Sequence, residues 1–91
     1  MKQQLEEYLT YLALERGLSR TTCASYALDL SLFQGFLQQQ GVASFAAAEA
    51  AHIRDFLRHL KAGGREASTI ARKLSAIKGL YRFLEGQRVV L

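Results

Sequence analysis

Hydrophobic residues recur every three or four positions along nearly the whole chain, which is the spacing that gathers them on one side of an α-helix. Strand-like alternation never extends beyond a few residues. The periodicity predicts four helices, over residues 2–16, 19–40, 47–62 and 67–85. Glycines expected to end them are Gly17, Gly41, the Gly63–Gly64 pair and Gly86. The pattern therefore predicts an all-α fold, a compact four-helix bundle with short connections.

The second predicted helix is expected to be the central one, because its apolar arc is wider than a single stripe. Leu28, Leu32 and Phe36 widen that arc, so we expect the helix to touch two neighbours. The third helix has no obvious cap at its start, where Ser44 is the best capping residue and a break is expected near 47–50. The four predicted stripes are Leu5, Tyr8, Leu9 and Leu12; Tyr26, Leu30, Phe33 and Leu37; Ile53, Phe56, Leu57 and Leu60; and Ile70, Leu74, Ile77, Tyr81 and Leu84.

Composition places the chain among small globular domains. It has 91 residues, 49% of them hydrophobic and 22% charged, which is too apolar for a disordered segment. Its single cysteine, Cys23, has no disulfide partner, and no Cys/His spacing suits zinc. Neither a signal peptide nor an apolar run of membrane-spanning length is apparent, so we expect a cytoplasmic protein without membrane contact.

Charge divides unevenly between the two halves of the chain. Residues 1–50 carry three bases and five acids, whereas residues 51–91 carry nine bases and three acids. The net charge of +4 is therefore concentrated in the second half. Such asymmetry favours a polyanionic partner, although modest positive charge is also common on domains that bind nothing anionic.

No catalytic, cofactor or metal site is predicted. His52 and His59 are two helical turns apart, about 10 Å, which is too far for a shared metal. Cys23 near a helix start is better explained as a small buried apolar residue than as a reactive thiol. The adjacent Glu6 and Glu7 diverge by about 100° on a helix, so they do not form a catalytic pair. No glycine-rich phosphate loop is present.

The far side of the fourth predicted helix is the most informative surface. It carries three cations, two hydroxyls, a glycine and no acid. An ordinary solvated helix face usually mixes both signs of charge, whereas a helix that lies in a DNA major groove needs cations for phosphates and polar groups for base edges. Chance clustering on a solvated face is the alternative. The residues of this face are Ser68, Arg72, Ser75, Lys78, Gly79 and Arg82.

The start of the second predicted helix supplies a companion surface. Short hydroxyl side chains and one cation gather where free backbone N–H groups already favour phosphate. The alternative is simple capping by Ser19, with threonines in the first turn. The residues are Ser19, Arg20, Thr21, Thr22 and Ser25.

Two segments carry a family resemblance. GLSRTTCASYALDLSLFQGFL and ASTIARKLSAIKGLYRFL resemble the N-terminal core-binding, or SAM-like, domain of tyrosine recombinases of the Xer and phage-integrase type. The resemblance extends from about Leu5 to Gly86, and its most specific part is the fourth-helix segment. The matching positions are Gly17, Leu18, Ser19, Thr22, Tyr26, Asp29, Leu30, Ser68, Thr69, Ile70, Arg72, Leu74, Ser75, Ala76, Ile77, Lys78 and Tyr81.

The resemblance implies one half of a clamp around duplex DNA, with the second and fourth helices crossing the major groove. Thr22 would then contact phosphate, and Ser25, Ser68 and Arg72 would face base edges. Lys73, Lys78 and Arg82 would anchor phosphates. Lys73 lies only about 60° from the centre of the apolar stripe, so flanking the groove is the alternative for this residue. The full set of expected DNA contacts is Arg20, Thr21, Thr22, Ser25, Ser68, Thr69, Arg72, Lys73, Ser75, Lys78 and Arg82.

The resemblance also implies a larger parent protein that cleaves and rejoins DNA in integration or recombination. None of that family's catalytic motifs is present here, so residues 1–86 are expected to be a DNA-binding domain without enzymatic activity. Residues 87–91 would begin a linker to a catalytic domain, or else an apolar tail folded on the core. The expected partners are a recombination half-site and, for the parent, other recombinase subunits in a synaptic tetramer. Alone, the domain is expected to be monomeric.

Two rival functions remain. In the first, the chain is a protein-interaction helix bundle whose basic fourth helix docks onto an acidic partner and has no role on DNA. A small transcription regulator is disfavoured, because no short helix-turn-helix pair or dimerisation segment is evident.

Overall fold

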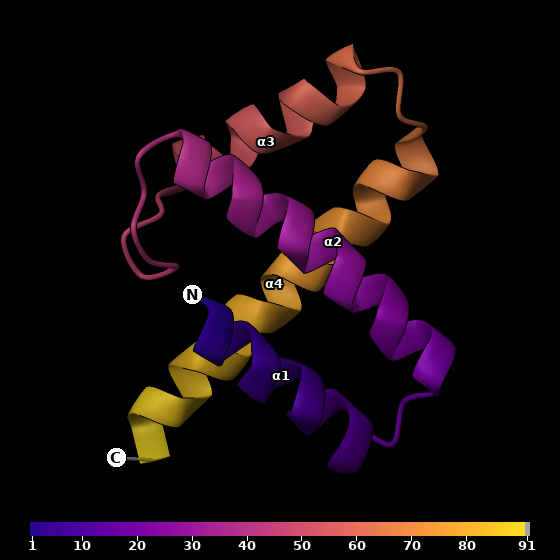
Figure 1. Ribbon diagram of the computed structural model, residues 1–91, viewed down its shortest axis with the longest axis vertical. Coiled ribbons are helices and arrows are strands. Elements are labelled where there is room, and N and C mark those ends of the chain that lie inside the picture. The colour runs from indigo at the N-terminus through magenta and orange to yellow at the C-terminus, as the bar shows by residue number, and fades with distance from the viewer. Residues whose placement is uncertain (91) are drawn as a thin grey trace.

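The computed structural model describes the backbone of residues 1–90 and the side chains of residues 1–86. It contains α1 (Lys2–Leu14), α2 (Arg20–Gln39), α3 (Ala50–Ala62) and α4 (Ala67–Val90) (Figure 1). No strand occurs within residues 1–90. The predicted all-α fold of four helices is confirmed.

Two long helices, α2 and α4, cross near the middle of the molecule (Figure 1). α1 packs against both of them on one side of the crossing, and α3 packs against both on the other. Within the described part of the chain, α1 and α3 do not touch each other. α2 is therefore central, as predicted, and α4 is equally so.

The core is continuous and draws on every helix and on the segment before α3. Phe33 lies at its centre, with ring centroids 5.3 Å from Phe56 and 6.2 Å from Phe45. Tyr81 donates a 2.7 Å hydrogen bond to the Phe45 carbonyl, and burial raises the pKa of its hydroxyl to about 12. The buried apolar residues are Leu5, Tyr8, Leu12, Leu30, Phe33, Leu37, Val42, Phe45, Phe56, Leu60, Ala76, Ile77 and Leu80.

Three of the predicted glycine stops are confirmed by their backbone conformation. Gly17, Gly41 and Gly64 have φ of 63°, 77° and 85°, in the left-handed region that glycine adopts without strain. The next residue after each glycine then donates its N–H back into the finished helix, as Leu18 does to Leu12 at 3.1 Å. Five residues connect α1 to α2 and four connect α3 to α4, as the prediction of short connections requires, whereas the connection from α2 to α3, which contains Gly41, is longer and takes ten residues.

The start of α3 differs from the prediction. Ser44 caps only a separate turn, in which the N–H of Ala47 donates to the Ser44 hydroxyl at 3.2 Å. The expected break follows, and α3 begins at Ala50 rather than at 47 because Glu49 and His52 form a reciprocal capping box.

The end of α4 also differs. The helix continues through Gly86 to Val90, so the predicted end at residue 85 is wrong. Gly86 does not adopt the positive φ that ends a helix at glycine elsewhere in this chain. The expected linker or folded-back tail at residues 87–91 depends on side chains outside the described residues.

The buried face of α4 is rotated from the predicted stripe. Its fully buried positions are Lys73, Ala76, Ile77 and Leu80, whereas the other four stripe residues are half-buried. The rotation follows from packing, because α4 is contacted by all three other helices and not along a single line. On α2 the predicted apolar arc is too wide: Leu28 is 60% exposed, and Leu32 is also exposed.

Gly79 of α4 packs against the Tyr8 side chain of α1. A Cβ atom at this position would clash with the Tyr8 hydroxyl oxygen and would lie 3.5 Å from Tyr8 Cζ. Tyr8 is buried, and its ring packs 5.3 Å from Phe83 and 6.3 Å from Tyr11. The predicted outward face of α4 therefore contains one residue, Gly79, whose role is packing.

We expect the change in unfolding free energy caused by Gly79→Ala to have opposite signs when residue 8 is tyrosine and when it is phenylalanine. Within a helix, alanine in place of glycine stabilises the folded chain by about 1 kcal/mol through its higher helix propensity. The clash with the Tyr8 hydroxyl destabilises it by about 1–3 kcal/mol, because side chains or backbone must shift to make room. The substitution should therefore destabilise the wild-type chain and stabilise a Tyr8→Phe chain, which lacks the obstructing oxygen. Urea unfolding of the four chains of this cycle measures the difference.

Gly35→Ala is the matched control, because Gly35 lies inside α2 and a Cβ there meets nothing within 4 Å. It should stabilise the chain whichever residue occupies position 8. A Gly79→Ala effect that is the same in both backgrounds would contradict the proposed contact.

Candidate nucleic-acid interface

A buried carboxylate joins α2 to α4. Asp29 on α2 accepts hydrogen bonds from Arg72 Nε at 3.0 Å and Arg72 Nη2 at 3.0 Å, one on each carboxylate oxygen. Lys73 Nζ donates to the same carboxylate at 2.6 Å. The side chains of Asp29 and Lys73 are 0% and 2% exposed, whereas that of Arg72 is 49% exposed. Asp29, Arg72 and Lys73 form what we call the crossing triad.

The electrostatics of the crossing triad favour the charged forms of Asp29 and Arg72. Burial by itself would raise the pKa of Asp29, but the hydrogen bonds and positive charges of Arg72 and Lys73 outweigh it, so the pKa lies below its ordinary value. The hydrogen bond to Asp29 in turn raises the pKa of Arg72. Two cations and one anion leave a net charge of +1, and Arg72 brings that charge to the surface.

Local sequence explains why the two cations have different environments. Asp29 follows Tyr26 by three positions and precedes Phe33 by four, so it lies on the inward side of α2. Arg72 and Lys73 are consecutive and diverge by about 100° around α4. One therefore reaches the carboxylate from the surface, and the other reaches it from within the core.

The structure places most of the predicted contact residues at the surface. Ser25 and Thr69 are half-buried. Lys73 is the exception: its ammonium is enclosed and bound to Asp29, so it is not available to anchor a phosphate, and that expectation does not fit the structure. The exposed residues are Arg20, Thr21, Thr22, Ser68, Arg72, Ser75, Lys78 and Arg82.

The capping interpretation of the start of α2 is confirmed for Ser19. Its hydroxyl oxygen accepts the Thr22 N–H at 3.1 Å, and its own hydrogen is donated to Thr22 Oγ1 at 2.9 Å. The Thr22 hydroxyl acts as acceptor in this pair and keeps its hydrogen to donate elsewhere. Ser19 therefore caps α2 while the Thr22 hydroxyl remains able to donate a hydrogen bond to a ligand.

The crossing triad brings two predicted surfaces to the same side of the molecule. The N-terminal halves of α2 and α4 diverge from the crossing toward the same side in Figure 1. Ser25 lies one turn before Asp29, and Ser68 lies one turn before Arg72, so each is close to the ion pair along its own helix. Lys78 and Arg82 lie beyond the crossing, along the C-terminal half of α4.

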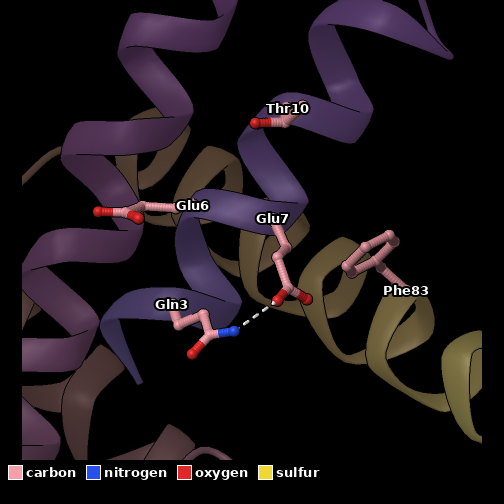
Figure 2. A pocket seen from close by; sticks show the side chains of 5 residues that line it. All are labelled: Gln3, Glu6, Glu7, Thr10 and Phe83. Carbon is pink, nitrogen blue, oxygen red and sulfur yellow. Dashed lines mark hydrogen bonds between the residues drawn. The ribbon is translucent and has the colours of Figure 1, made fainter.

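Elsewhere within residues 1–86, no second carboxylate is buried between helices. Figure 2 shows a shallow pocket between α1 and α4 in which Glu6 and Glu7 point in different directions. Gln3 Nε2 donates to Glu7 there at 3.2 Å. Within residues 1–86, no three His, Cys, Asp or Glu side chains are grouped as metal ligands would be. His52 serves as a cap, because its Nδ1 accepts the Glu49 N–H at 2.9 Å.

The sequence also predicts that Cys23 is a small buried residue and that no segment spans a membrane. Cys23 is half-buried, and its Sγ lies 3.9 Å from the Leu18 carbonyl oxygen. None of the helices, as far as they are described, has the length and apolar character needed to cross a bilayer.

Sequence reasoning missed the role of Asp29. The signal was present, because an acid at an inward position between Tyr26 and Phe33 requires a cationic partner if it is to be buried. The sequence does not show which of the nine bases in the second half would supply it.

Comparisons with known proteins agree with the resemblance. The family model of the phage integrase N-terminal SAM-like domain matches residues 5–88. A tyrosine recombinase XerC of Herpetosiphon aurantiacus is 39% identical over 90 residues, which is 99% of this chain and 29% of that protein. A tyrosine recombinase XerD of Chlorobaculum tepidum is 42% identical over 88 residues, 97% of this chain and 29% of that protein. No solved structure matches significantly.

We expect Asp29→Asn to destabilise the fold strongly, because it leaves the Lys73 ammonium buried without a counter-charge. Breaking a buried pair in this way costs about 3–5 kcal/mol. The double variant Asp29→Leu/Lys73→Met removes both buried charges with little change of volume and should stay close to the wild-type stability. Urea unfolding followed by circular dichroism compares them; a double variant less stable than Asp29→Asn would contradict this account.

Acid should lower the unfolding free energy of the wild-type chain more than that of the Asp29→Leu/Lys73→Met variant. The pKa of Asp29 is lowered in the folded chain from an unfolded value of about 3.9, so its stabilising contribution is complete only above about pH 5. As the pH falls, Asp29 binds a proton in the unfolded chain before it does so in the folded chain. The stabilisation by charged Asp29 therefore decreases, and it is gone once the pH is below the folded pKa. Unfolding free energies at a series of pH values should therefore fall more steeply for wild type; parallel curves would contradict the prediction.

Proposed function

The chain belongs to the phage integrase N-terminal SAM-like domain family, and on this basis we propose that it binds double-stranded DNA. In this proposal the N-terminal half of α2 and the outer face of α4 lie against the major groove. The chain would act as the core-binding half of a clamp whose other half is a separate catalytic domain.

The observation that carries the proposal is the exposed, acid-free face of α4. Arg72, Lys78 and Arg82 are exposed along it, together with Ser68 and Ser75. α4 carries no acid between Ala67 and Leu84. Cations bind phosphates and hydroxyls bind phosphates or base edges, so this face offers both kinds of contact that a DNA-binding helix makes.

The start of α2 supports the same surface with a second set of donors. Arg20 and Thr21 are exposed in its first turn, and the Thr22 hydroxyl retains a hydrogen to donate. The first N–H groups of a helix have no partner within the helix and favour an anion. We assign Arg20, Thr21 and Thr22 to phosphate contacts and the half-buried Ser25 to the groove side of α2.

The wider role follows from the proteins that the chain resembles. The chain spans about 29% of the length of the XerC and XerD recombinases that it matches. We propose that it positions a tyrosine recombinase on a recombination half-site and that other subunits complete a synaptic assembly. Strand cleavage and rejoining would belong to the remainder of such a protein.

Binding to duplex DNA should be weak and should depend steeply on salt. If Arg20, Lys78 and Arg82 each neutralise one phosphate, the logarithm of the association constant should fall with the logarithm of salt concentration at a slope of about −3. Fluorescence anisotropy with a labelled duplex at several salt concentrations measures this slope. An affinity that does not change with salt would contradict a phosphate-led interface.

Reversal of two charges should separate DNA binding from docking onto an acidic protein. Lys78→Glu/Arg82→Glu should lower the salt slope by about two and weaken binding, because each residue contributes about one phosphate contact. Both side chains are exposed, so the melting temperature should stay unchanged. Arg54→Glu/Lys61→Glu on the exposed face of α3 makes the same change in net charge and should weaken binding much less. If the α3 variant weakens DNA binding as much as the α4 variant does, the chain is attracted to DNA by its net charge and not through this face of α4.

A further inference from the structure

We propose that Asp29 is a positioning residue that holds the Arg72 guanidinium so that its Nη1–Nη2 edge is a preformed bidentate donor for a guanine in the major groove. This inference rests on the proposed DNA binding and adds to it a specific base, a specific edge of one side chain and a role for a buried residue that cannot itself touch DNA.

The hydrogen bonds of the crossing triad determine which donors remain available. A guanidinium has five N–H donors in one plane and two edges that can each make a pair of parallel hydrogen bonds. Asp29 occupies the edge formed by Nε and Nη2. The opposite edge keeps one N–H on Nη1 and one on Nη2, and among the described residues it has no further partner.

The burial of Asp29 makes this orientation rigid. Its carboxylate is fully enclosed, and Lys73 fixes it from within at 2.6 Å. Two hydrogen bonds to a fixed carboxylate determine both the position and the plane of the guanidinium, so little rotational entropy is left to lose on binding. The Arg72 side chain is nevertheless 49% exposed, so the plane is fixed where a ligand can reach it.

Guanine fits this edge better than a phosphate does. Its O6 and N7 are adjacent acceptors in the major groove and pair with two parallel N–H donors. Asp29 behind the guanidinium reduces the net attraction for a phosphate charge but leaves the geometry of the two donors intact. The neighbours of Arg72 within one turn on the outer side of α4 are Ser68, Thr69 and Ser75, which are hydroxyls and not further cations.

The experiment begins with duplexes that the chain itself selects from a random pool, since the selection identifies a preferred site directly. Each guanine of an enriched duplex is then replaced in turn by 7-deazaguanine, which lacks N7, or by inosine, which keeps both O6 and N7. At one position we expect the wild-type chain to lose about tenfold in affinity with 7-deazaguanine and little with inosine.

Three variants test the role of Asp29. Lys73→Met keeps the Asp29–Arg72 pair and should retain the tenfold discrimination. Asp29→Leu/Lys73→Met removes the positioning carboxylate and should discriminate less than about threefold, while its affinity for the 7-deazaguanine duplex is unchanged or higher. Arg72→Lys keeps the charge but has no pair of parallel donors, so it should lose discrimination and keep the wild-type salt slope. Circular dichroism checks that each variant is folded.

The outcomes separate this inference from the proposed function. If the wild-type chain shows no salt-dependent binding to any duplex, the DNA-binding function itself is wrong. If it binds but no position distinguishes 7-deazaguanine from inosine, Arg72 contacts phosphate only and the inference is overturned. Full discrimination by the folded Asp29→Leu/Lys73→Met variant overturns the role of Asp29, and should that variant not fold, full discrimination by Arg72→Lys overturns the guanine contact.

Discussion

One buried carboxylate joins the two longest helices at the point where they cross. Asp29 is enclosed, and its charge is tolerated only because Arg72 and Lys73 bind it from opposite sides. An ion pair of this kind contributes little stability compared with a well-packed apolar replacement, because desolvation offsets the attraction. Its value lies in geometry: charged groups that must meet at hydrogen-bond distance fix the register of α4 against α2 more narrowly than apolar contact does.

The rest of the fold supports that crossing from both sides. On one side Tyr8, Tyr11 and Phe83 pack α1 against α4, where Gly79 allows the helices to approach closely. On the other side Phe33, Phe45 and Phe56 form the centre of a core shared with α3. Because α1 and α3 each contact both long helices, the angle between α2 and α4 is held at either end of the crossing.

The surface that we propose to bind DNA is thereby attached directly to the interior. Arg72 belongs to both, since one edge of its guanidinium is bound to the core carboxylate and the side chain is half exposed. The exposed positions of α4 on either side, from Ser68 to Arg82, follow from the same rotation of the helix about its axis. The packing of the core and the proposed recognition of DNA therefore both depend on the orientation of α4.

The sequence by itself determined the four helices, most of their ends and the exposed polar face of α4, because hydrophobic period and glycine stops are local properties that do not depend on which helices lie nearby. It did not determine that α4 continues past Gly86, since a glycine ends a helix only when the chain turns there. Nor did it determine that Lys73 is buried while Leu28 is exposed. Those two placements were decided by tertiary structure: a lysine enters a core only where a carboxylate from another helix neutralises it, and a leucine stays outside where no helix covers it.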